Sequence, residues 1–366
     1  MLILFALKVC PLTQLQTSPL EKALEALLNP SLVDDHLACA AADPVTAGGP
    51  APRTALLHVR FNEDVPKIDD LARYLWEECF YYALPRRRQE AFVKDAATNP
   101  SVMLRVGNAV RDAFIKFNEK NPSRASEVAE VLAYCVVQHF LQAGQVVAKM
   151  GLKTSSNMPV HGLDGIHAKY ENGAVTIYFL EAKLAKSANS GAKDYAQSAS
   201  HFLTSPGQYL REYQIISELG NLDTLPQPAR ELALEQFDIF GKPLIKRRER
   251  YVGIICYSDK NYSNTIPIDD TGPVDAHELH FASLYSALHD SHRKTAAKHL
   301  KKNGANAAKC IVYFVAVPNV NELRKSFYQV MGVPMPAGAA TIEDSDDDEN
   351  DVDGDETDET DLESPQ

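Results

Sequence analysis

The sequence lacks several patterns that would assign it to familiar classes of protein. None of its six cysteines forms a CxxC pair, so the spacings of zinc ribbons and zinc fingers are absent. There is no Walker A motif, so we do not expect the chain itself to hydrolyse ATP, and no GxSxG or Cys–His protease signature occurs. No apolar run approaches the ~20 residues that a membrane-spanning helix needs.

The cysteines and the first residues bear on the compartment. Scattered cysteines in a chain of 366 residues are typical of free, buried thiols in a reducing environment, which predicts a cytoplasmic protein. Residues 1–7 are apolar, but no basic segment precedes them, and Lys8 and Cys10 follow directly. This order favours a buried strand over a secretory signal.

The net charge of −12 is concentrated at one end of the chain. Between Glu343 and Glu363 there are 14 acidic residues and no lysine or arginine. The rest of the chain has 37 basic residues against 35 acidic ones, so its charge is nearly balanced. We therefore expect an acidic, disordered tail on a folded part that is compatible with a nucleic-acid partner.

Apolar periodicity predicts a mixed α/β protein. The apolar spacing and the turn residues predict helices over residues 19–28, 69–83, 100–118, 123–143, 192–203 and 321–331, and strands over residues 56–61, 164–170, 174–184, 251–257 and 310–317. Residues 38–53, rich in Ala, Pro and Gly, are expected to form a linker or loop. Asn172-Gly173 between two strand-like runs is a strong signal for a β-hairpin.

The second strand of this hairpin carries an unusual pair of charges. Side chains alternate along a strand, so Glu181 and Lys183 point to the same face of a segment that is otherwise apolar on both faces. Buried charges are costly unless something compensates them. A divalent metal held by Glu181 and by Asp164, just before the first strand, would do so. The alternative is that Asp164 caps a turn and the other two form a surface pair, which the apolar strand disfavours.

This arrangement suits phosphodiester hydrolysis. Carboxylate oxygens hold Mg²⁺ or Mn²⁺, and we expect the Ala182 carbonyl to serve as a backbone ligand. A bound metal polarises the phosphate and activates water, while Lys183 would stabilise the charge that develops there. His161 and His167 flank Asp164, but the surrounding carboxylates fit Mg²⁺ better than zinc. Basic residues at 86–88, 246–248 and 293–302 are either contacts to a phosphate backbone or solvated surface.

The order of helix, hairpin and E-x-K resembles the pattern of PD-(D/E)xK nucleases. That resemblance implies an α/β/α core with a mixed sheet, and a further carboxylate from the preceding helix. Glu130 is our choice for this carboxylate, as a catalytic and metal-binding residue, and Glu127 is the alternative. Ala129-Glu130 stands where the family usually has Gly-Glu.

More closely, the chain resembles the HamA family, the nuclease subunits of the Hachiman antiphage defence system. The resemblance covers roughly residues 55–332 and is carried by residues 68–71, 82–86, 129–132, 162–165, 180–183 and 314–318. It implies Mg²⁺-dependent cleavage of DNA and partnership with a superfamily 2 helicase, HamB. The competing hypothesis is an inactive nuclease fold that serves as a DNA-binding or helicase-regulating subunit.

The expected organisation has three parts. Residues 1–54 form an N-terminal extension and linker, residues 55–335 the nuclease domain with its core at about 123–205, and residues 336–366 the acidic tail.

Overall fold

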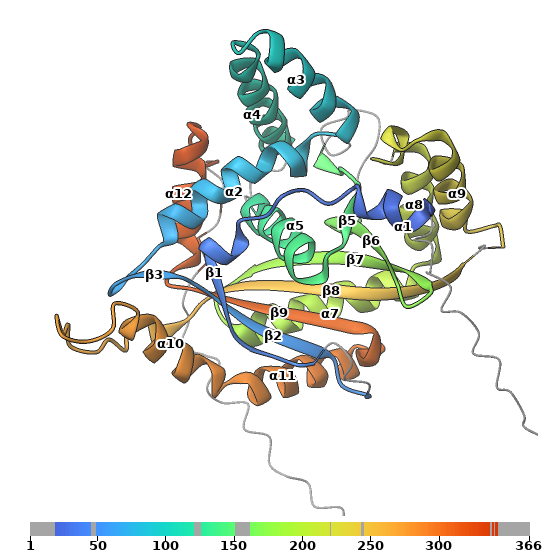
Figure 1. Ribbon diagram of the computed structural model, residues 1–366. Coiled ribbons are helices and arrows are strands. Elements are labelled where there is room, and N and C mark those ends of the chain that lie inside the picture. The colour runs from blue at the N-terminus through green and yellow to red at the C-terminus, as the bar shows by residue number, and fades with distance from the viewer. Residues whose placement is uncertain are drawn as a thin grey trace, which may run out of the picture.

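A seven-stranded mixed sheet forms the centre of the protein. The computed structural model describes residues 19–44, 49–120, 126–150, 162–219, 221–242, 245–336, 339 and 341–342. The strands lie in the order β1-β2-β9-β8-β7-β6-β5 (Figure 1). Their bounds are β1 Leu37–Ala42, β2 Arg53–Val59, β5 Gly144–Val147, β6 Gly165–Glu171, β7 Ala174–Ala185, β8 Lys246–Ser258 and β9 Cys310–Val317. A separate two-stranded ribbon consists of β3 (Phe61–Asn62) and β4 (Val65–Pro66).

The four inner strands β2, β9, β8 and β7 run parallel to one another. The outer strands β1, β6 and β5 pair with their neighbours in the antiparallel sense. Parallel strands are normally covered on both faces, and here helices cover both faces of the sheet (Figure 1). This confirms the expected α/β architecture and is consistent with an α/β nuclease-like core.

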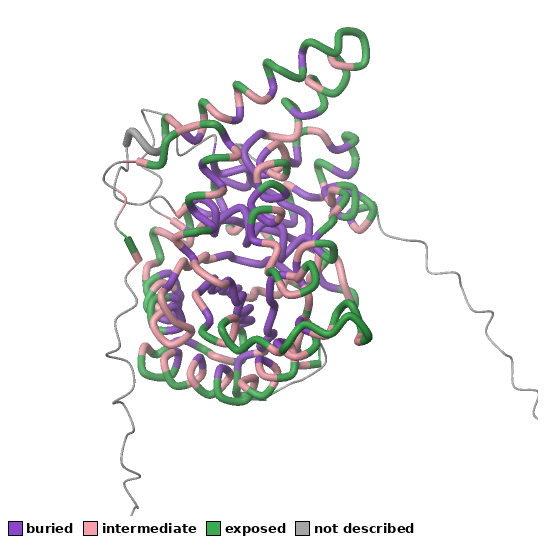
Figure 2. The backbone as a smooth tube through the Cα atoms, turned by 90° about the vertical axis from the view of Figure 1, so that its left-hand side faces the viewer, coloured by how far each residue is buried: buried purple, intermediate pink, exposed green. Residues whose placement is uncertain are grey.

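Helices from distant parts of the chain form the two outer layers. One face is covered by α2 (Ile68–Ala83), α4 (Val102–Lys120), α5 (Glu127–Leu141) and α12 (Val320–Met331). The other is covered by α7 (Ala188–Thr204), α10 (Ala276–Ser286) and α11 (His289–Lys302) together with α1 (Pro19–Glu25), α8 (Pro206–Leu219) and α9 (Gln227–Phe237). Helix α3 (Arg86–Thr98) packs against α4 outside these layers. In Figure 2 the buried backbone is concentrated in the sheet and its adjoining helices.

Strand β7 lies between the two layers and contributes to both. Tyr178 and Leu180 pack into the cluster on the α5 side, whereas Ile177 and Phe179 pack into the cluster on the α7 side. The sequence-based expectation of a central strand with two apolar faces is therefore confirmed. No helix among the described segments is both long and apolar enough to cross a membrane.

The hairpin between β6 and β7 is confirmed as well. Asn172 and Gly173 form its turn with φ angles of 51° and 70°. Positive φ at both central residues gives the turn a twist that matches the flanking strands, and glycine adopts it without a steric penalty.

Several segments differ from the expectations. The stretch expected as a loop over residues 38–53 contains most of edge strand β1, and β5, α3, α8, α9 and α10 were not foreseen. Helix α3 was missed because only Gln89 is buried in it, so it has no apolar stripe to detect. Strand β5 was missed because its four residues are too few to show a pattern. The strand predicted at residues 1–7 lies outside the described residues, and so does the acidic part of the tail from residue 343 onward.

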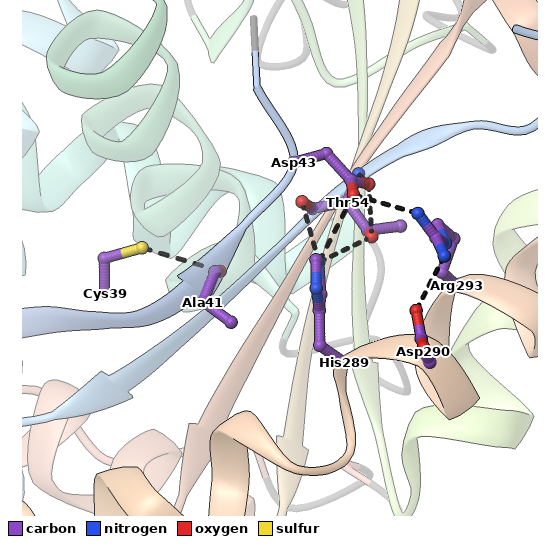
Figure 3. Close-up of polar contacts among 7 residues, drawn as sticks. All are labelled: Cys39, Ala41, Asp43, Thr54, His289, Asp290 and Arg293. Carbon is purple, nitrogen blue, oxygen red and sulfur yellow. Dashed lines mark hydrogen bonds and ion pairs between the residues drawn. The ribbon is translucent and has the colours of Figure 1, made fainter. Parts of the chain in front are cut away.

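A polar cluster fastens the edge of the sheet to helix α11 (Figure 3). The Asp43 carboxylate accepts hydrogen bonds from the Thr54 amide at 2.8 Å and from the Thr54 hydroxyl at 2.9 Å. Arg293 Nη1 lies 3.2 Å from the other carboxylate oxygen, and His289 Nε2 lies 3.0 Å from the Thr54 hydroxyl. The side chain of Asp43 is only 9% exposed, so its hydrogen-bond partners are these protein groups and not water.

We expect Asp43→Ala to lower the free energy of unfolding by about 2–3 kcal/mol, because the buried Thr54 amide loses its acceptor and the ion pair with Arg293 is removed. Asp290→Ala is the matched control: Asp290 binds the same Arg293 but is 72% exposed. It should cost less than about 1 kcal/mol. Urea denaturation of both variants measures the difference, and equal losses would contradict the role given to Asp43.

Candidate active site at the end of strand β7

Glu181 and Lys183 lie side by side near the end of β7. Lys183 Nζ donates a hydrogen bond to Glu181 Oε1 at 2.7 Å. The side chain of Glu181 is only 15% exposed and that of Lys183 only 23% exposed, so the pair is largely withdrawn from water. Strand alternation brings both onto the face covered by α7, as the sequence predicts.

Asp164 reaches the same end of the sheet from the neighbouring strand. Its amide donates to the Leu180 carbonyl at 2.9 Å, and its Oδ2 accepts from the Ala182 amide at 2.8 Å. The amide and carbonyl of a residue in a strand leave on the same side. The Ala182 carbonyl is therefore directed to the side of β7 on which Asp164 lies. Of the predicted residues, the structure brings together Asp164, Glu181, Ala182 and Lys183.

The electrostatics of the site are centred on Glu181. Burial raises the pKa of its carboxyl to about 7, and the nearby negative charge of Asp164 contributes to that rise. The Lys183 ammonium and a hydrogen bond from Ser198 on α7 act in the opposite direction. Two carboxylates thus repel each other in a partly dry site, where a second cation would relieve the repulsion.

Helix α7 closes the site with an aromatic ring that the sequence did not suggest. Tyr195 is buried, and its hydroxyl donates to the Tyr251 carbonyl at 2.9 Å. Gly253 is paired with Glu181 across the β7–β8 ladder. A Cβ at Gly253 would lie 2.7 Å from the Tyr195 ring, so only glycine lets this ring pack beside the carboxylate. Burial raises the pKa of Tyr195, and the charge of Glu181 contributes to that rise.

The two candidate helix carboxylates have different surroundings. Glu127 is fully buried and accepts a hydrogen bond from Tyr328 on α12 at 2.8 Å. Glu130 accepts a hydrogen bond from Tyr82 on α2. The pKa of Tyr82 is raised by burial first, then by Glu130, and also by Asp164. The hydrogen-bond partner of Glu130 is thus also affected by the charge of Asp164, although the helix of Glu130 covers the opposite face of the sheet from Glu181.

Of the two histidines beside Asp164, His167 lies in the core of the protein. His161 lies outside the described residues. His167 is buried against the Tyr134 ring, and its Nδ1 lies 2.9 Å from the Ala143 carbonyl. Burial lowers the pKa of His167 to about 4. Its environment is that of a neutral core histidine.

The donor set fits a hard divalent cation. Asp164 and Glu181 supply carboxylate oxygens, and the Ala182 carbonyl supplies a third oxygen from the backbone, which are the ligands that Mg²⁺ and Mn²⁺ prefer. Within the described segments, no group of three or more His, Cys, Asp or Glu side chains is arranged to hold a metal. Two carboxylates and a carbonyl are enough protein ligands for Mg²⁺, because this ion usually keeps several of its waters.

Comparison with known proteins assigns most of the chain to one family. The model of the family described as HamA matches residues 41–331. No curated protein matches the chain. The matched region begins near the end of β1 and ends at the last residue of α12, so it includes the other six strands of the central sheet in full.

The pKa of Glu181 gives a prediction for stability against pH. A carboxyl whose pKa is higher in the folded state contributes most below its unfolded pKa of 4.5, and this contribution is lost as the pH rises toward about 7. Glu181→Gln removes the titrating carboxyl, so the variant does not lose this stability as the pH rises. We expect the variant to gain on the order of 2 kcal/mol relative to wild type between pH 5 and pH 8.

Denaturation of both proteins at the two pH values tests this. Glu90→Gln serves as the control, because Glu90 is 57% exposed on α3 and should change stability little at either pH. A Glu181→Gln variant whose relative stability does not change between pH 5 and pH 8 would rule out a raised pKa.

Proposed function

The chain belongs to the HamA family and is thus a Hachiman defence-associated protein, and we propose that it is a metal-dependent deoxyribonuclease of the PD-(D/E)xK type. The observation that carries the proposal is the convergence of the Asp164 and Glu181 carboxylates at the end of β7, with Lys183 in contact with Glu181. In this proposal the chain is the effector subunit that cuts phage-associated DNA.

Each residue has a distinct role in the proposed reaction. Asp164, Glu181 and the Ala182 carbonyl would hold Mg²⁺ or Mn²⁺, and Glu130 is proposed as the supporting helix carboxylate. When bound, the metal would lower the pKa of a coordinated water and polarise the scissile phosphate. Lys183 neutralises negative charge that builds up on the phosphate, and it acts strongly because the site is only partly open to water. The hydrogen bond from the Ala182 amide fixes the orientation of Asp164.

A basic surface on α11 supports a nucleic-acid substrate. Lys294, Lys298 and Lys301 are exposed at helical spacing on one side of this helix, and Lys302 follows. The helix packs on α7, where His299 Nε2 lies 2.8 Å from Asn189 Oδ1 in the first turn. The pKa of His299 is lowered by burial first and then by Lys298, Lys302 and Lys193. The positive field thus extends to the helix that begins just after Lys183, where it can attract a phosphate backbone.

We propose a HamB-like helicase as the partner that restrains the nuclease until aberrant DNA is present. The alternative function is an inactive nuclease fold that binds DNA or regulates the helicase. The presence of Asp164, Glu181 and Lys183 with a direct Lys183–Glu181 contact favours the enzyme, because an inactive fold has no need of a costly charge pair in its central strand.

The central prediction concerns cleavage. Lys183→Ala should reduce the rate of DNA cleavage by ~100- to 1000-fold, the usual cost of losing one group that stabilises transition-state charge. Glu181→Ala should also abolish cleavage, but additional Mn²⁺ should partly restore it, because the defect is in metal binding. The measurement is cleavage of DNA by the full chain with Mg²⁺, Mn²⁺ or EDTA, with and without the helicase.

Controls separate chemistry from folding. Lys169→Ala removes a lysine of similar exposure from the same hairpin and should leave cleavage unchanged. Melting temperature and helicase binding should be retained in both active-site variants. Wild-type cleavage by both would disprove the catalytic assignment, and loss of cleavage with loss of folding would instead favour a structural role for the pair.

The basic surface can be tested separately. The double variant Lys298→Glu/Lys302→Glu should weaken DNA binding and reduce the dependence of log affinity on log salt by about 1 for each phosphate that the helix no longer neutralises. Lys325→Glu is the matched control, since Lys325 is exposed on α12 over the opposite face of the sheet. Equal effects of both changes on affinity would show that α11 makes no specific contribution.

A further inference from the structure

A completely buried ion pair lies beside the candidate site and was not suggested by the sequence. Lys149 Nζ lies 2.5 Å from Glu212 Oε2, and the two side chains are 0% and 1% exposed. Lys149 follows β5 closely, and Glu212 lies in α8. The two residues are far apart in the chain, so no local signal in the sequence indicates that they meet.

Both members of this pair hold the same backbone unit. The Lys149 ammonium donates to the Leu163 carbonyl at 2.6 Å, and the Leu163 amide donates to Glu212 Oε1 at 3.2 Å. Glu212 thus uses one carboxylate oxygen for the lysine and the other for the backbone. This arrangement requires glycine at position 162, because a Cβ there would lie 2.3 Å from Glu212 Oε1 and displace the carboxylate.

The energetic balance indicates what this pair contributes. Removing two ions from water costs several kcal/mol per ion, and apolar residues of similar volume are often as stabilising or more so. The pair is therefore a poor source of stability. It does provide direction, because an ammonium and a carboxylate fix both polar groups of one peptide residue at the same time.

The residue held is the one immediately before Asp164. On its other side, Asp164 is bound through its amide to Leu180 and through its carboxylate to the Ala182 amide. Asp164 is thus constrained from both directions, by the ladder within the sheet and by the ion pair outside it. A metal ligand must be held within ~0.5 Å of its productive position, which requires support of this kind.

We propose that Lys149 and Glu212 are positioning residues that set Asp164 for metal binding; this inference rests on the proposed metal site. The ion pair itself touches neither substrate nor metal. It acts through the Gly162–Leu163 backbone, and its loss should lower the affinity of the site for a divalent cation even where the fold is unchanged.

The decisive variant is Lys149→Met/Glu212→Met in the full chain, which fills the same volume without charge. Its melting temperature should equal or exceed that of wild type, whereas each single variant should melt much lower because it leaves one buried charge uncompensated. Calorimetric titration of Mn²⁺ into the metal-stripped double variant should show an affinity ~10- to 100-fold weaker than that of wild type. This is the usual effect of losing the hydrogen bonds that support a metal ligand.

The matched control is Arg60→Met/Glu278→Met. It removes another ion pair, at 2.7 Å, from the region of β3 and α10, and it should leave Mn²⁺ affinity unchanged. A folded Lys149→Met/Glu212→Met variant that binds Mn²⁺ as wild type does would overturn the proposal. If that variant does not fold, Gly162→Ala decides, since it pushes Glu212 away from Leu163 without removing a charge, and wild-type Mn²⁺ affinity would again overturn the proposal.

Asp164→Asn distinguishes this inference from the function on which it rests. If Asp164→Asn loses Mn²⁺ affinity and the double methionine variant does not, the positioning role is wrong and the metal site stands. If Asp164→Asn binds Mn²⁺ as wild type does, the metal site itself is wrong and the positioning role falls with it.

Discussion

The interaction on which the candidate site depends is the contact between Lys183 and Glu181 at the end of a strand buried on both faces. Strand β7 has seven buried residues in succession before Glu181. A charge placed directly after such a run has little access to bulk water, because helices cover both sides of the sheet. The site is thus charged and partly dry, which raises the pKa of Glu181 and favours a bound cation. Those are also the conditions under which a lysine stabilises developing charge most effectively.

Several contacts around the end of β7 compensate the buried charges. Lys183 partly neutralises Glu181, the Ala182 amide solvates Asp164, and Tyr82 donates to Glu130. Lys149 and Glu212 neutralise each other and direct their remaining hydrogen-bonding capacity to the backbone before Asp164. These contacts come from strands and helices on both sides of the sheet, so the site is held by the whole α/β architecture and not by the hairpin alone.

Family membership and site geometry bear on different questions. The HamA match covers six of the seven strands in full and assigns the chain to Hachiman defence. The geometry bears on chemistry: two carboxylates repel each other, a lysine contacts one of them, and a backbone carbonyl leaves β7 on the side where the other lies. An inactive family member would share the match, but it would gain nothing from this arrangement.

The sequence alone was sufficient for features set by neighbouring residues. Asn172-Gly173 specifies the hairpin because both positions need positive φ, and alternation along β7 puts Glu181 and Lys183 on one face. Only the tertiary structure decided contacts between distant segments, such as Lys149 with Glu212 and Tyr82 with Glu130. The same holds for β1, which becomes a strand by pairing with β2 although its composition resembles that of a loop. Local pattern reports φ/ψ preference and the face a residue presents, whereas the partner of a buried charge is set by how sheet and helices pack.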